Sequence, residues 1–155
     1  MKKIDQCCQP SAEKRATPMH CPICRQKGKR VQLITLKALI RPSALETIDP
    51  EKSYAFCINP SCDVVYFSDV QTFETNKIKV PVFQIDDALD VPVCYCFGWT
   101  RERLKQAVQE NRQPVDQIRE QIRANRCGCE VNNPQGSCCL GNVTTFIQTL
   151  KRATR

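Results

Sequence analysis

Two stretches decide how this chain folds: Val93-Cys94-Tyr95-Cys96 and Cys127-Gly128-Cys129-Glu130-Val131-Asn132-Asn133-Pro134-Gln135-Gly136-Ser137-Cys138-Cys139. Four thiolates that converge on one point can hold a zinc ion or an iron–sulfur cluster. Structural zinc sites usually take their ligands in C-x2-C or C-x4-C pairs. A C-x-C pair and a gap of nine residues between Cys129 and Cys139 do not follow that spacing. The pattern therefore favours a cluster.

Three helices are predicted around these cysteines. Thr100 is a good N-cap for a helix over 101–112. Pro114 suits the first turn of a second helix, and Asn142 can cap a third. Their apolar stripes recur at helical spacing. The stripes are Leu104, Ala107, Val108; Val115, Ile118, Ile122; and Val143, Phe146, Ile147, Leu150.

Two of the predicted helices begin close to a cysteine. Thr100 comes four residues after Cys96, and Asn142 comes three after Cys139. Helix N-termini carry free N–H groups and a positive dipole end, which would point toward an anionic cluster. Hydrogen bonds to the sulfurs and a nearby positive field favour the reduced state of such a cluster and so raise its potential.

An earlier set of four cysteines has the spacing of a zinc ribbon. Cys21-Pro22-Ile23-Cys24 and Cys57-Ile58-Asn59-Pro60-Ser61-Cys62 are two short-spaced pairs separated by 32 residues. Proline and asparagine suit the tight knuckles that wrap one ion. We therefore predict that Cys21, Cys24, Cys57 and Cys62 bind Zn2+, in a site that is lost and regained independently of the cluster.

Strands are expected on both sides of the second zinc pair. Residues 54–56 and 64–67 read as a hairpin, and Val31–Leu36 reads as a further strand. Prolines limit 37–52 to a loop with at most one helical turn, and 78–83 is expected to be an edge strand.

Two other cysteine features leave alternatives open. Met19–Cys24 also matches M-x-C-x-x-C, a copper-binding loop that uses two sulfurs. Here, however, Cys57 and Cys62 can supply the other two thiols of a four-cysteine site. His20 is interpreted as an ordinary exposed side chain. Cys7-Cys8 is either two exposed cysteines or a thiol pair for a soft ion such as Cu(I).

Cysteine usage and charge narrow the class of protein. Twelve cysteines in 155 residues point to metals or disulfides. The N-terminus lacks the apolar core of a signal peptide, and no run approaches the roughly 18 apolar residues of a membrane span. A cytoplasmic metalloprotein is therefore expected. The formal charge of +7 falls to about +3 once two four-thiolate sites are counted, which weakens the case for nucleic acid.

Three segments of the sequence resemble a known protein family. Pro92–Cys96, Asn133–Cys139, and Cys57-x4-Cys62 followed by Val64–Phe67 look like the N-terminal domain of CopZ-type copper chaperones. That domain carries a [2Fe-2S] cluster, in a module related to bacterioferritin-associated ferredoxin, beside a mononuclear zinc site. The resemblance covers roughly residues 19–150. It implies that the cluster ligands are Cys94, Cys96, Cys129 and Cys139, with Cys127 and Cys138 spare.

The resemblance and the patterns together predict an α+β protein. A mobile tail over 1–18 precedes a small antiparallel β zinc-ribbon-like module over 19–85, and a small helical [2Fe-2S] module follows over 86–155. The sequence ends at Arg155 without the heavy-metal-associated domain in which such chaperones carry their copper pair.

The resemblance implies one-electron transfer, reduction of Cu(II) to Cu(I) and copper trafficking. Its expected partners are copper or another soft metal ion, an electron-donor reductase and a metal-transporting ATPase. One alternative is a ferredoxin-like partner in a metal-detoxification system, and another, ranked last, is a zinc-ribbon nucleic-acid-binding redox sensor. With a single histidine, the sequence offers no Ser/His/Asp or Cys/His set, so a hydrolytic enzyme is not expected.

Overall fold

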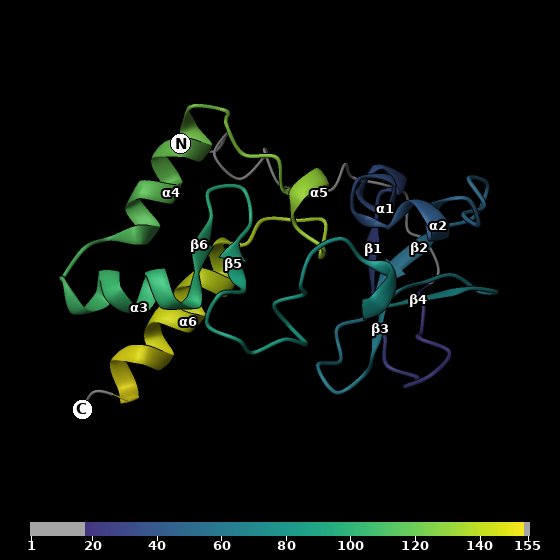
Figure 1. The fold of residues 1–155 in the computed structure, drawn as a ribbon, viewed down its shortest axis with the longest axis horizontal. Helices are drawn as coiled ribbons and strands as arrows, with labels where there is room; N and C mark the ends of the chain where they lie inside the picture. The colour runs from purple at the N-terminus through teal and green to yellow at the C-terminus, as the bar shows by residue number, and fades with distance from the viewer. Residues whose placement is uncertain (1–17, 154–155) are drawn as a thin grey trace.

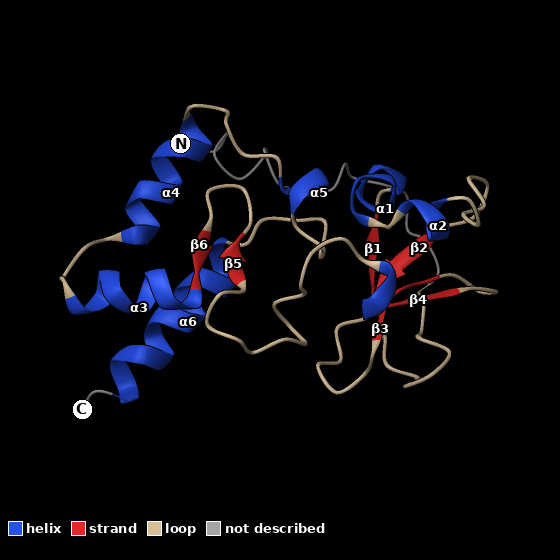
Figure 2. Cartoon of the chain, in the orientation of Figure 1, coloured by secondary structure: helices blue, strands red, loops and turns tan. Residues whose placement is uncertain are grey.

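A β-rich lobe and a helical lobe lie side by side in the structure, a computed structural model that describes residues 18–153 (Figure 1). The β-rich lobe comes first in the chain, and the helical lobe follows it (Figure 2). The arrangement is α+β, as the sequence predicts. Within the described residues, every helix is too short or too polar to cross a membrane.

The sheet of the first lobe has four antiparallel strands in the order β1-β2-β3-β4. The predicted hairpin is confirmed, because β2 and β3 pair with Phe56 opposite Tyr66. β4 was not predicted, and a short 3-10 helix, η2, follows it. The bounds are β1 Lys29–Val31, β2 Tyr54–Phe56, β3 Val64–Phe67, β4 Thr72–Glu74 and η2 Thr75–Lys77.

The prediction of a strand over Val31–Leu36 is wrong. β1 ends at Val31, and α1 occupies Leu33–Leu39. Leu36, Leu39 and Ile40 are at most 5% exposed and lie in the core of the first lobe. Their i, i+3, i+4 spacing is helical, and burial of that face outweighs the local preference for a strand.

The two proline-rich segments of this lobe have different outcomes. Segment 37–52 contains the end of α1 and one short helix, α2, which spans Pro42–Leu45 with its proline in the first turn. Segment 78–83 is not a strand, and that prediction is wrong. Only Ile78 pairs, in an isolated bridge. A proline within this segment removes a backbone donor that a ladder would need.

The helical lobe begins with a small hairpin and continues through four helices. Gly98, with φ of 68°, turns the chain between the two strands. Thr100 caps the next helix as predicted, since its Oγ1 accepts from the N–H of Arg103 at 3.1 Å. Pro114 opens the second helix. The bounds are β5 Pro92–Cys94, β6 Trp99–Thr100, α3 Arg101–Gln109, α4 Pro114–Arg123, α5 Cys129–Asn132 and α6 Leu140–Ala153.

The last helix starts earlier than predicted. Asn142 lies inside α6 and is not its cap, because its side-chain amide donates to Gln135 Oε1 at 2.9 Å. Val143 N–H donates to the carbonyl of Cys139 at 3.0 Å, so the helix begins directly after that cysteine. Its positive end is therefore closer to Cys139 than the sequence suggested.

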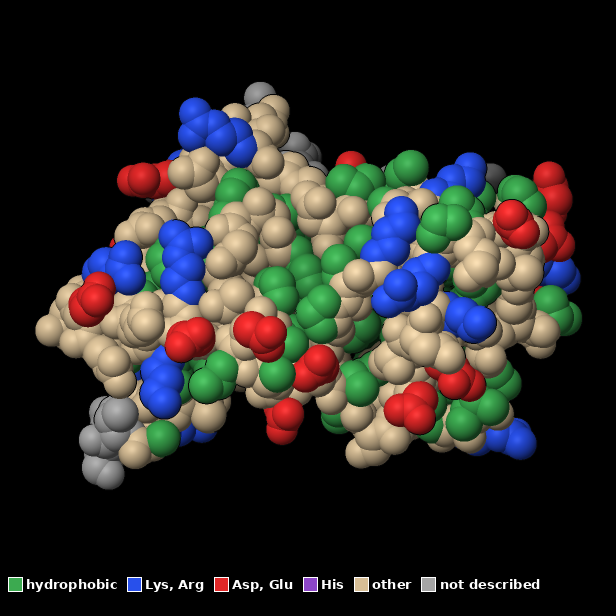
Figure 3. All heavy atoms as spheres, viewed as in Figure 1, with side chains coloured by type: hydrophobic (Ala, Val, Ile, Leu, Met, Phe, Trp, Pro, Cys, Tyr) green, Lys and Arg blue, Asp and Glu red, His purple; other side chains and the backbone are tan. Residues whose placement is uncertain are grey.

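The two lobes have separate apolar cores joined by the linker near residue 83. Val82 and Ile85 pack on the core of the β-rich lobe, whereas Phe83 packs on that of the helical lobe. The buried Arg101 guanidinium donates to Phe83 O at 2.7 Å and to Asp86 O at 2.6 Å. Hydrophobic side chains fill the junction on the face shown in Figure 3. A domain boundary at residue 85 stays a prediction, since these contacts tie both lobes to the linker.

Candidate metal centres

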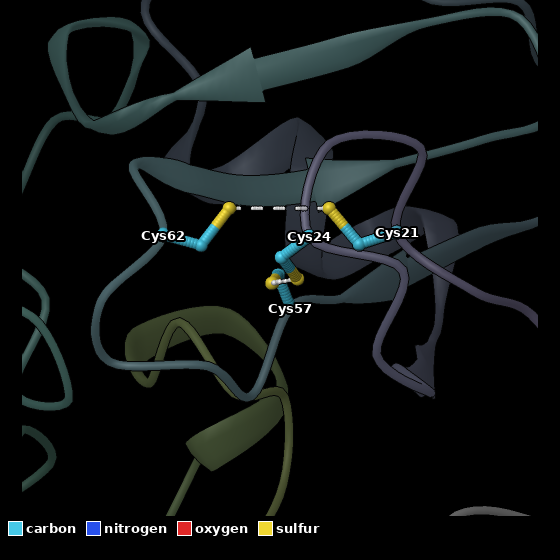
Figure 4. Close-up of side chains that lie close together, drawn as sticks. All are labelled: Cys21, Cys24, Cys57 and Cys62. Carbon is cyan, nitrogen blue, oxygen red and sulfur yellow. Dashed lines mark hydrogen bonds between the residues drawn. The ribbon is translucent and has the colours of Figure 1, made fainter.

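The first centre brings four thiols together beside the turn that joins the central strands β2 and β3. The Sγ atoms of Cys21, Cys24, Cys57 and Cys62 all lie within 4.8 Å of one another. Cys21 and Cys62 are 4.0 Å apart, and Cys24 and Cys57 are 3.6 Å apart (Figure 4). A tetrahedral zinc ion with Zn–S bonds near 2.3 Å separates its sulfurs by about 3.8 Å. The donor set therefore fits one zinc ion.

Backbone hydrogen bonds shape the two knuckles that carry these thiols. In the first, Cys21 N–H donates to Gln26 O at 2.9 Å, and Arg25 adopts a left-handed φ of 67°. In the second, Cys62 N–H donates to Asn59 O at 3.1 Å, and Asn59 Oδ1 accepts from Ser61 N–H at 3.0 Å. These hydrogen bonds turn the chain within each pair, so that all four thiols converge.

The thiols of this centre have unequal acidities. Burial raises the pKa of Cys57 and of Cys62. At Cys24 burial acts in the same direction, but hydrogen bonds from the Gln26 backbone and the Asn59 side chain outweigh it and lower the pKa to about 7. Four crowded thiolates need a cation to stay ionised together. His20 is exposed and is not part of the group.

The second centre contains the four cysteines that the family resemblance implied. Cys96 and Cys129 Sγ are 3.5 Å apart. The thiol of Cys139 is hydrogen-bonded to both Cys129 and Cys94, and these bonds, together with burial, raise its pKa. Cys94 ends β5, Cys129 opens α5, and Cys139 directly precedes α6. Elements far apart in sequence thus supply one group of thiols.

The second group is more extended than the first. Among residues 18–153, only the zinc set has three or more ligand atoms mutually within 4.8 Å. The thiols of the second set instead form a chain of neighbours from Cys94 through Cys139 and Cys129 to Cys96. A single tetrahedral ion needs all four sulfurs equally close. The second set does not have that compact arrangement.

Two donors aimed at Cys96 were not foreseen from the sequence. Gly128 N–H donates to its Sγ at 3.2 Å, and Asn132 Nδ2 approaches the same sulfur at 3.6 Å. Such outer contacts orient a ligand and stabilise negative charge on its sulfur. The glycine between two cysteines is the one sequence signal that could have indicated a close backbone approach here.

The cysteines outside the two groups differ from one another. Cys138 is half-buried, is not in a disulfide and directly precedes Cys139. Cys127 is half-buried and packs against the core of the helical lobe, and its status as a spare cysteine stays a prediction. Cys7 and Cys8 lie outside the described residues.

Comparisons with known proteins agree with this geometry. The zf_CopZ family, described as a zinc binding domain, matches residues 18–79. The copper chaperone CopZ of Archaeoglobus fulgidus is 30% identical over 122 residues, which are 78% of this chain and 58% of that protein. The X-ray structure of the Archaeoglobus fulgidus CopZ N-terminal domain superposes with a TM-score of 0.69 at 29% identity, over 83% of this chain and 97% of that domain.

These matches confirm the resemblance and the α+β fold. The chain spans 58% of the length of the curated relative, and nearly all of the solved N-terminal domain. The four-cysteine group that fits zinc lies inside the matched segment 18–79. The chain is therefore homologous to the CopZ N-terminal domain, and its residues 18–79 match the zf_CopZ zinc binding domain family.

Proposed function

We propose that the protein is a redox metalloprotein in which a [2Fe-2S] cluster on Cys94, Cys96, Cys129 and Cys139 works beside a structural zinc on the first cysteine group. The observation that carries the proposal is the extended chain of four thiols beside a compact group that fits zinc. A set of four cysteine thiolates is the usual ligand set of a [2Fe-2S] cluster.

The zinc has a structural role in this proposal. Its four thiols close the coordination shell, which leaves no open position for a substrate. The first knuckle precedes β1 and the second is part of the loop that joins β2 to β3, so the ion would fasten the sheet of a small lobe. Small lobes bury little apolar surface, and the binding energy of a structural zinc adds directly to folding.

The cluster, when bound, would supply one-electron chemistry. The protein's own residues set the conditions for it. Gly128 N–H and Asn132 Nδ2 point at Cys96, and α6 begins directly after Cys139. Both features favour a more negative charge at the site and hence raise the reduction potential.

Copper is the proposed acceptor of the electron. The similarity to a protein named copper chaperone supports this choice. Cu(II) would gain one electron to become Cu(I), and the reduced cluster would lose that electron. An electron-donor reductase would supply electrons, and a metal-transporting ATPase would receive the copper. Free thiolates require a reducing compartment, so the proposal places the protein in the cytoplasm.

Two other functions compete with copper handling. A ferredoxin-like role in metal detoxification would use the same cluster with a different acceptor. A nucleic-acid-binding sensor has less support, because on the face in Figure 3 basic side chains alternate with acidic ones over the helical lobe, and only a small group of them gathers on the β-rich lobe. Nucleic-acid sites usually gather them in a patch or stripe.

The test is anaerobic mixing of the reduced protein with Cu(II) in the presence of a Cu(I)-specific chromogenic chelator. We expect the visible bands of the oxidised cluster to return as the Cu(I) complex appears, with one electron passed per cluster. A cluster that stays reduced while a non-physiological oxidant still reoxidises it would remove copper reduction and leave the ferredoxin-like role.

A further inference from the structure

The loop that joins two proposed cluster ligands rests on the zinc lobe. Residues 130–138 connect Cys129 to Cys139, and within them Pro134 O accepts a hydrogen bond from Tyr66 Oη at 2.5 Å. Lys29 Nζ donates to Ser137 Oγ. α5 also packs beside α1 of the zinc lobe (Figure 1). The loop is thus held from outside its own module.

Both anchors come from strands that continue out of the zinc knuckles. Tyr66 lies in β3, four residues after Cys62, and Lys29 lies in β1, five residues after Cys24. The Tyr66 side chain is completely buried, with its ring 6.2 Å from that of Phe56. A buried phenol in a packed sheet has little freedom, so its hydroxyl marks a fixed point for the loop.

At Gly136 the backbone of the loop lies close against β1 and α1. Gly136 has φ of 73°, and a Cβ there would lie 3.1 Å from Val31 Cγ1 and 3.2 Å from Thr35 Oγ1. Thr35 is fully buried, and its hydroxyl has no hydrogen-bond partner. The absence of a side chain at position 136 lets the loop dock on the helix.

Hydrogen bonds within the loop fix its shape but not its place. Asn133 Nδ2 donates to Ser137 O at 3.0 Å, and Gln135 Nε2 donates to Cys138 O at 2.9 Å. Neither reaches β5, where Cys94 lies. Asn142 of α6 and Gln84 of the linker also donate to Gln135 of the loop. The contacts from Tyr66 and Lys29 are the ones that tie the loop, and therefore Cys129 and Cys139 at its two ends, to the zinc lobe.

We propose that Tyr66 is a positioning residue, supported by Lys29, through which the zinc lobe acts as the template that holds Cys129 and Cys139 in register with Cys94 and Cys96. The inference rests on the proposed cluster. Zinc would then affect the cluster as well as the sheet, because a change in the zinc lobe reaches the cluster through the strand that follows each knuckle.

The test compares two conservative variants of the same sheet, Tyr66→Phe and Tyr54→Phe. Tyr54 is also buried, but its hydroxyl bonds Gln71 Oε1 at 3.1 Å within the zinc lobe and does not touch the loop. Each change removes one hydroxyl from a buried ring. We expect cluster loss to an iron chelator to be about fivefold to tenfold faster in Tyr66→Phe and unchanged within about twofold in Tyr54→Phe.

A second readout does not depend on the cluster. Amide hydrogen exchange of residues 133–138 should speed up in Tyr66→Phe and not in Tyr54→Phe, while both variants keep one zinc. Lys29→Met provides an independent route to the same result if Tyr66→Phe folds poorly. Equal cluster loss and equal loop exchange in all variants would overturn the positioning role. A wild-type protein without iron would instead overturn the proposed function, so the two failures are distinguishable.

Discussion

At the residue scale, adjacent cysteines are predicted to have opposite importance. Cys139 is 2% exposed and its thiol is hydrogen-bonded to two other thiols, whereas its neighbour Cys138 is half-buried. Cys139→Ala should abolish the cluster or shorten its lifetime at least about tenfold, because one iron loses its ligand. Cys138→Ala should leave the visible spectrum intact, since it removes a small, weakly polar side chain. Iron content and absorbance check both. Bleaching by Cys138→Ala alone would shift the ligand assignment by one residue.

Zinc affinity should fall as the pH falls. The pKa values of Cys57 and Cys62 are raised, mainly by burial, so both thiols are protonated in the metal-free protein at neutral pH. Zinc binds thiolates and must displace these two protons. The apparent dissociation constant should therefore rise at least about 100-fold for each unit that the pH drops below 7, because these two protons are the minimum that a four-thiolate site displaces. Competition with a chelator between pH 6 and pH 7 measures it, and a constant affinity would contradict the shared burial of these thiols.

At the element scale, the docking of the 130–138 loop on α1 depends on Gly136. Gly136→Ala places a methyl group against Val31 and Thr35 at a left-handed φ, which should cost about 1–3 kcal/mol. Gly141→Ala is the matched control, because a Cβ at that position in α6 meets nothing within 4 Å. The control should be neutral or stabilise by up to about 1 kcal/mol. Denaturant unfolding of the zinc-loaded proteins gives both values. Equal stabilities would show that the loop does not press on α1.

Among the helices and sites, some could be predicted from the sequence and others could not. Thr100 and Pro114 locate α3 and α4, because caps and first-turn prolines act locally. α1 was missed because its identity depends on burying Leu36 against distant strands. The start of α6 was misplaced because Asn142 bonds to Gln135 and does not cap the helix. The zinc ligands could be predicted from the spacing of the cysteines, whereas no local sequence pattern marks Tyr66 as a residue that anchors the loop.

At the scale of the whole molecule, the two metal centres should be lost together. The sequence suggested independent sites, but Tyr66 and Lys29 link the zinc lobe to the ligand loop. Cys57→Ala should release the zinc and also speed cluster loss several-fold, because a loosened sheet no longer holds the loop. Metal analysis and visible absorbance over time follow both events. A cluster that lives equally long without zinc would restore the independent picture.

The central claim of two different metal centres is tested most directly by metal analysis of protein purified without oxygen. We expect two irons, two acid-labile sulfides and one zinc per chain, with the red-brown colour of a [2Fe-2S] protein. A colourless protein that holds two zinc ions and no iron would contradict it, and would return the second group of cysteines to a purely structural role.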